Sequence, residues 1–168
     1  TKWLDCAGFL VVLLIHGDIF FPLETLKGGD LIAFHYPYLN ALRAGAGETL
    51  FPFWFPEVFA GGPGIPDIGT TLMSPLNLLL LVADAATTLK MQVFIYLLIM
   101  AVGMRRWARL WTESDVWATL AAVLMLASFQ TRGLLAYGHL VILSSMALLP
   151  WMLYALHRLS QAEQIRER

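Results

Sequence analysis

The chain has 168 residues, of which 58% are hydrophobic and 14% are charged, and its mean hydropathy is +0.67. Soluble domains average about 45–50% apolar and about 25% charged residues, so this composition is typical of a protein embedded in lipid. The formal net charge of −1 argues against a nucleic-acid partner, and the single cysteine excludes an internal disulfide.

Four apolar stretches approach the length of about 20 residues that a helix needs to cross a bilayer. They cover residues from about 3 to 21, 89 to 104, 116 to 129 and 139 to 156. The last contains Pro150, which a membrane helix tolerates where neighbouring groups satisfy the freed carbonyl. The sequence therefore predicts an all-α, polytopic membrane protein with about four transmembrane helices, forming a single transmembrane domain over residues 1–168.

A long loop, from about residue 22 to 88, joins the first two crossings. Within it, apolar residues recur at spacings of three and four over Asp30–Ala44, which indicates an amphipathic helix lying in the membrane interface. The apolar stripe consists of Leu31, Phe34, Tyr38, Leu39 and Leu42. Pro37 falls inside this helix and is expected to kink it. The apolar segment Leu76–Ala83 is too short to cross the bilayer, so we expect a re-entrant or interfacial helix there.

Basic residues predict the orientation, because the cytoplasmic flanks of membrane helices carry an excess of Lys and Arg. Seven basic residues flank the crossings and fall on one side if there are four: Lys2, Arg105, Arg106, Arg109, Arg158, Arg166 and Arg168. The loop over residues 22–88 has two basic residues against six acidic ones. We therefore expect the loop outside and both termini in the cytoplasm of a bacterium, with the chain in its inner (cytoplasmic) membrane.

Asp30 follows the first crossing, at the start of the predicted interfacial helix. A carboxylate at this position suits two roles, which do not exclude each other. It can cap the helix by accepting hydrogen bonds from the amide groups of the first turn. It can also act as a general base that deprotonates an acceptor hydroxyl in a group transfer.

Four other polar residues are candidates for binding a substrate on the same side. His35 follows Asp30 on the same segment, and Arg43 offers a planar fork that suits phosphate oxygens. Arg132 and His139 occupy the expected short outer turn between the third and fourth crossings. Each also has a structural interpretation: His35 as a polar surface residue, Arg43 in contact with lipid headgroups, and the other two as anchors at helix ends.

Two loop carboxylates, Glu57 and Asp67, flank a run of glycine and proline over residues 61–66. Together with Asp30 they are candidates to line one substrate site. Oxygen ligands of this kind also suit a divalent cation, although no spacing in the loop resembles a metal motif. We expect no cofactor, with a divalent cation as the alternative.

Eight short motifs lie between about residues 28 and 158: Gly29-Asp30-Leu31, Tyr36-Pro37, Pro52-Phe53-Trp54, Gly61-Gly62-Pro63, Ser74-Pro75-Leu76-Asn77-Leu78-Leu79, Gly103-Met104-Arg105, Gly138-His139-Leu140 and Leu149-Pro150-Trp151. Together they resemble bacterial YfhO-like membrane proteins, a family grouped with the GT-C glycosyltransferases. The resemblance implies a multi-pass enzyme that takes a sugar from a polyprenyl-phosphate donor at the outer face. It also implies an acidic base in the first outer loop, for which Asp30 is the matching position. By location, Arg43, Arg132 and His139 are candidates to steady the departing phosphate.

GT-C proteins usually have many more crossings than four. We therefore expect the chain to be either the N-terminal part of a full enzyme or a shortened relative. The second hypothesis for its function is a non-catalytic accessory subunit of a larger membrane complex. Small residues of the third crossing, Ala118, Ala121 and Ala122, would let partner helices approach closely. The expected partners are the lipid bilayer, a lipid-linked sugar and other membrane subunits.

Overall fold

The computed structural model describes residues 12, 14–17, 26, 28–45, 54–55, 61–63 and 74–166. Within these residues the protein is helical, apart from one pair of two-residue antiparallel strands, β1 (Trp54–Phe55) and β2 (Gly62–Pro63). The predicted all-α class is therefore confirmed.

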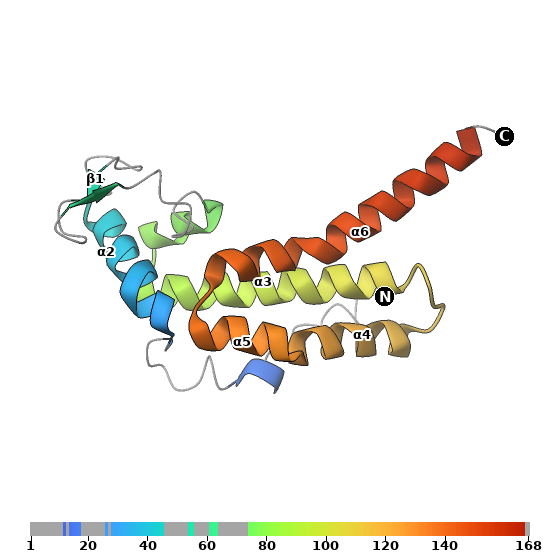
Figure 1. Cartoon of the computed structure of the whole chain (residues 1–168), viewed down its shortest axis with the longest axis horizontal. Coiled ribbons are helices and arrows are strands. Elements are labelled where there is room, and N and C mark those ends of the chain that lie inside the picture. Colours follow the sequence, from blue (N-terminus) through green and yellow to red (C-terminus); the bar gives the residue numbers. More distant parts are fainter. Residues whose placement is uncertain are drawn as a thin grey trace.

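Three helical spans among the described residues are long and apolar enough to cross a membrane. The first is α3 (Ala85–Ala108). The second, Asp115–Tyr137, consists of α4 (Asp115–Ala127) and α5 (Phe129–Tyr137). The third is the first 23 residues of α6 (Leu140–Arg166). Figure 1 shows α3 between α6 and the α4–α5 pair, with the C-terminal part of α6 extending past the bundle.

The predicted crossing over residues 89–104 lies within α3, which extends further at both ends. The one over residues 139–156 begins one residue before α6, and α6 continues to Arg166. The stretch 116–129 was predicted too short, because the span continues to Tyr137. Arg132 therefore lies within a membrane span and not in the outer turn. The stretch 3–21 falls mostly outside the described residues, so four crossings remain a prediction.

The second span is broken between α4 and α5 at Ser128, whose extended ψ of 147° interrupts the helical hydrogen bonds. Two carbonyls next to the break accept hydrogen bonds from side chains. The Thr131 hydroxyl donates to the Met125 carbonyl at 2.9 Å, and Nε2 of the buried His16 donates to the Leu126 carbonyl at 3.1 Å. Lipid offers no replacement partner, so these bonds let the span bend inside the membrane.

The predicted amphipathic helix is present as η1 (Leu31–His35) continuing into α2 (Tyr36–Gly45). The wider π turn of η1 ends at His35, two residues before Pro37, and the Tyr36 amide donates to the Leu31 carbonyl. Proline has no amide hydrogen and crowds the carbonyl four residues earlier, so a wider turn relieves a strained α-helical bond.

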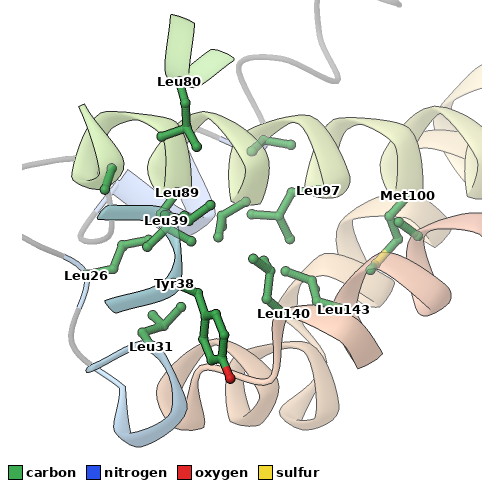
Figure 2. Packing of buried hydrophobic residues seen from close by; sticks show 14 of the residues in the cluster. Leu26, Leu31, Tyr38, Leu39, Leu80, Leu89, Leu97, Met100, Leu140 and Leu143 are labelled. Atoms are coloured by element: carbon green, nitrogen blue, oxygen red, sulfur yellow. The ribbon is translucent and has the colours of Figure 1, made fainter. Parts of the chain in front are cut away.

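The apolar stripe of this helix is buried against the protein itself. Four of its five residues belong to the core cluster: Leu31, Tyr38, Leu39 and Leu42. Figure 2 shows Leu39 beside Leu89 of α3, and Tyr38 in the same cluster as Leu140 of α6. Phe34, the remaining member, is exposed. The bundle thus covers the surface that the sequence assigned to the lipid interface.

The short helix predicted over Leu76–Ala83 is confirmed as the 3-10 helix η3 (Pro75–Leu81). It runs back along α3, since the Ser74 and Tyr96 hydroxyls bond at 2.9 Å and the Gln92 amide donates to the Asn77 side chain at 2.8 Å. Tyr96 lies 12 helical residues after Asp84, which corresponds to a rise of about 18 Å along α3. The segment from Ser74 to Asp84 therefore folds back along about this length of the helix.

The polarity of η3 is reversed relative to a water-exposed helix. Its polar residue Asn77 is buried against α3, whereas the large exposed residues of the segment are apolar: Leu78, Leu81 and Val82. Apolar side chains facing outward and a bonded polar side chain facing inward suit a segment surrounded by lipid. This favours the re-entrant interpretation over one at the membrane surface.

We predict that η3 contacts acyl chains. In a background carrying Cys6→Ser, a spin label at Leu78→Cys should be more accessible to oxygen than to a water-soluble nickel reagent. Leu124→Cys, exposed on α4, is the lipid-facing control, and Glu113→Cys, in the α3–α4 loop, is the water-facing control. A label at residue 78 that behaves like the one at residue 113 would show that the segment lies in water.

The packing of α3 on α6 generates a second prediction. The Trp151 indole donates to the Ile99 carbonyl at 2.8 Å, and a Cβ on Gly103 would lie 2.5 Å from two atoms of that ring. Gly103→Ala should therefore destabilise the protein by about 1–3 kcal/mol. Gly133→Ala is the matched control, because its Cβ would meet nothing within 4 Å. Melting temperatures in detergent that are equal for the two variants would contradict this packing.

Candidate functional site

Two of the residues singled out in the sequence, Asp30 and His139, meet at one end of the helical bundle. Nδ1 of His139 lies 2.7 Å from Oδ2 of Asp30, although the two residues are 109 positions apart. The side chains are 41% and 40% exposed, respectively, so the pair is open to solvent or substrate. A carboxylate accepts, and the ring Nδ1 therefore carries the hydrogen.

Two glycines make this meeting possible. Gly138 ends α5 in the left-handed conformation, with φ of 82°, and its amide donates to the Leu134 carbonyl. A Cβ on Gly28 would lie 3.0 Å from the Gly138 nitrogen, and a Cβ on Gly138 would lie 2.8 Å from the Leu31 nitrogen. The backbone before η1 therefore rests directly on the α5–α6 turn, which fixes Asp30 beside His139.

The expected capping role of Asp30 is wrong. Its side chain makes no capping hydrogen bond, and its backbone is already helical, with φ of −69° and ψ of −30°. A capping residue normally has extended backbone angles that turn its side chain toward the first amides. Here the carboxylate points to His139 instead.

The other predicted residues do not join this pair. His35 is buried, so the interpretation as a surface residue is wrong. Arg43 is exposed near the end of α2, about 20 Å along the helix from Asp30. Arg132 donates to the Ile15 carbonyl at 3.3 Å, about 10 Å before His139 along α5. Glu57 and Asp67 lie outside the described residues.

Arg43 lies instead near the start of α3. Asp84 caps that helix by accepting from the Thr87 amide at 2.7 Å. Hydrogen bonds from Thr87 chiefly lower the pKa of Asp84, and the charge of Arg43 lowers it further. Arg43 therefore lies near the N-terminus of α3, where its charge acts on Asp84. It does not lie beside the Asp30–His139 pair.

Tyr137 was not singled out in the sequence, and Tyr36 was noted only as part of the motif Tyr36-Pro37. The Tyr137 ring is 5.9 Å from the His139 ring and its side chain is exposed. The Tyr36 hydroxyl donates to the Leu26 carbonyl at 3.4 Å, and burial raises its pKa, so it stays neutral at physiological pH. Tyrosine is common at the ends of membrane helices, where it anchors them in the interface. The position of Tyr137 in the sequence therefore does not distinguish a site residue from such an anchor.

The far end of the bundle carries a cluster of basic residues. Arg105 and Arg109 both contact the Asp115 carboxylate, at 3.0 and 3.1 Å. The Arg106 guanidinium lies 5.1 Å from the Trp151 ring. The cluster occupies the last turn of α3 and the residue that follows it, whereas the Asp30–His139 pair lies at the turn between α5 and α6. The carboxylate–histidine pair and the basic cluster thus lie at opposite ends of the membrane spans.

No group of three or more His, Cys, Asp or Glu residues arranged to hold a metal ion occurs in the part of the chain that the structure describes. Comparisons with protein-family models, with curated proteins and with solved structures find no match to this chain.

The close approach of Gly28 to Gly138 generates a third prediction. Gly28→Ala should push the segment before η1 away from Gly138, separating Asp30 from His139 and destabilising the protein by about 1–3 kcal/mol. Gly29→Ala is the matched control, because its Cβ would meet nothing within 4 Å. The measurement is the melting temperature of each purified variant in detergent. Equal values for both variants would mean that the close backbone approach does not hold the segment in place.

Proposed function

We propose that this chain is the membrane module of a GT-C-like glycosyltransferase, which transfers a sugar from a polyprenyl-phosphate donor at the outer face of the membrane. The observation that supports it most is the 2.7 Å contact between Asp30 and His139. Asp30 is the position that matches the base of the family in the first outer loop, and His139 belongs to a second motif of the same resemblance. A carboxylate–histidine pair open to its surroundings is suited to moving a proton.

The proposed reaction is a direct displacement at the anomeric carbon of the donor. The Asp30–His139 pair takes the proton of an acceptor hydroxyl, and the hydroxyl oxygen forms a bond to the anomeric carbon. The bond from that carbon to the phosphate oxygen breaks, and its electron pair leaves with the polyprenyl phosphate. Positive charge near the departing oxygen would stabilise the transition state. Arg132, about 10 Å from His139 along α5 and bonded to the Ile15 carbonyl, is the arginine candidate nearest to the pair along the chain.

The position of the pair supports an outer site. Cytoplasmic flanks of membrane helices are rich in Arg and Lys, and Arg105, Arg106 and Arg109 occupy the end of the bundle opposite to Asp30. With this orientation, the pair lies at the outer headgroup level, where the phosphate of a polyprenyl donor would lie. We propose a bacterial inner membrane with both termini in the cytoplasm, which requires the fourth crossing predicted over residues 3–21.

The accessory-subunit alternative loses its supporting feature. Ala118 and Ala122, two of the three small residues that would admit a partner helix, are buried within the chain itself. They are therefore already used in internal packing of α4, which contacts α3. Stoichiometric co-purification with a larger complex, without transfer activity, would restore that alternative.

The test replaces the acidic member of the pair. Asp30→Asn in the full-length protein should lower sugar transfer by about 10²–10⁴-fold, because an amide neither takes the proton nor orients a charged imidazole. Transfer is measured in membranes with a radiolabelled polyprenyl-phosphate hexose, following label that reaches endogenous acceptors. Glu113→Gln, at the opposite end of the bundle, is the control and should leave the rate unchanged. A near wild-type rate in Asp30→Asn would remove Asp30 from catalysis.

A further inference from the structure

The Asp30–His139 pair poses a question of roles that the proposed function leaves open. Either group can take a proton, and both side chains are partly exposed. The hydrogen on Nδ1 of His139 is committed to Asp30 at 2.7 Å. In a neutral imidazole the other nitrogen, Nε2, then has the lone pair.

We propose that His139 is the catalytic base of the sugar transfer, and that Asp30 is a positioning residue which holds the imidazole through Nδ1. This deepens the proposed function and rests on it. The proton of the acceptor hydroxyl moves to Nε2, the oxygen bonds to the anomeric carbon, and the phosphate leaves with the electron pair of the broken bond.

The geometry around His139 supports this assignment. Among the described residues, Asp30 is its hydrogen-bond partner, and none bonds to Nε2. The ring is 40% exposed even with Nδ1 engaged. The turn that carries it is fixed by the left-handed Gly138 and by the approach of Gly28. Proton transfer requires a base that is held in a fixed position with its lone pair accessible, and these contacts hold the His139 ring in this way.

The chemistry of the two groups points the same way. A carboxylate bonded to Nδ1 fixes the tautomer of a neutral imidazole and leaves the lone pair on Nε2. After the proton arrives, the imidazolium is stabilised by the negative Asp30 that is bonded to its Nδ1.

The charged and titratable groups around His139 come from each element near it. Asp30 precedes η1, and Tyr137 comes from the end of α5, with its ring 5.9 Å away. Arg132 lies earlier on α5 and is bonded to the Ile15 carbonyl. Asp30 is thus the negative group in contact with the imidazole among the described residues, and the positioning role belongs to it.

The decisive variant is His139→Asn in the full-length protein. The asparagine Nδ2 can donate to Asp30 much as Nδ1 of histidine does, but it offers no base. The expected result with a radiolabelled polyprenyl-phosphate hexose is a fall in kcat of about 10²–10⁴-fold with KM little changed. His157→Asn, on the far part of α6, is the matched control and should retain the wild-type kcat.

Chemical rescue separates a catalytic from a structural role. Added imidazole should restore transfer to His139→Ala, because the small ring can occupy the vacated space and bond to Asp30. It should not restore transfer to the variant that also carries Asp30→Asn. Rescue shows that the altered protein is folded.

Two outcomes would overturn the inference in distinguishable ways. If His139→Asn transfers sugar at a near wild-type kcat, Asp30 itself is the base and the proposed function stands. If the wild-type protein transfers no sugar from any polyprenyl-phosphate hexose, the proposed function fails, and this assignment fails with it.

Discussion

Lipid supplies no hydrogen-bond partner to a backbone amide or carbonyl, and most of the packing described here follows from that constraint. Where the second span breaks at Ser128, His16 and Thr131 bond to the carbonyls beside the break. Where η3 folds back along α3, its side chains Ser74 and Asn77 bond to that helix. Polar residues within the apolar spans thus join one segment to another.

The end of the bundle that carries Asp30 depends on backbone contact rather than on large side chains. Gly28 and Gly138 approach closely enough that a methyl group on either would collide with its neighbour. Between α3 and α6 the contact is instead made by a large side chain, because the Trp151 ring fills the space beside Gly103. In both places a glycine sets the distance between elements that are far apart in sequence. Four of the eight short motifs contribute residues to these contacts, namely Leu31, Gly103, Gly138 and Trp151.

The sequence predicted the helical class, two of the crossings and the amphipathic helix, because apolar periodicity and length are local properties. It also selected both members of the Asp30–His139 pair, from position near helix ends. It could not predict their contact, since this depends on how the loop docks on the α5–α6 turn. The break at Ser128 and the buried His16 were missed for the same reason: a polar residue in an apolar run gives no sign of its distant partner. The capping role expected for Asp30 failed because a tertiary bond replaced a local one.

The 109 positions between the paired residues have a consequence for biosynthesis. Asp30 emerges early from the ribosome, whereas His139 follows only after α3, α4 and α5 have been made. Until that turn has formed, Gly28 has no backbone to pack against and the carboxylate has no imidazole partner. The site therefore arises as the last of these helices enters the bilayer, so a chain halted partway through insertion would hold the acid without its partner.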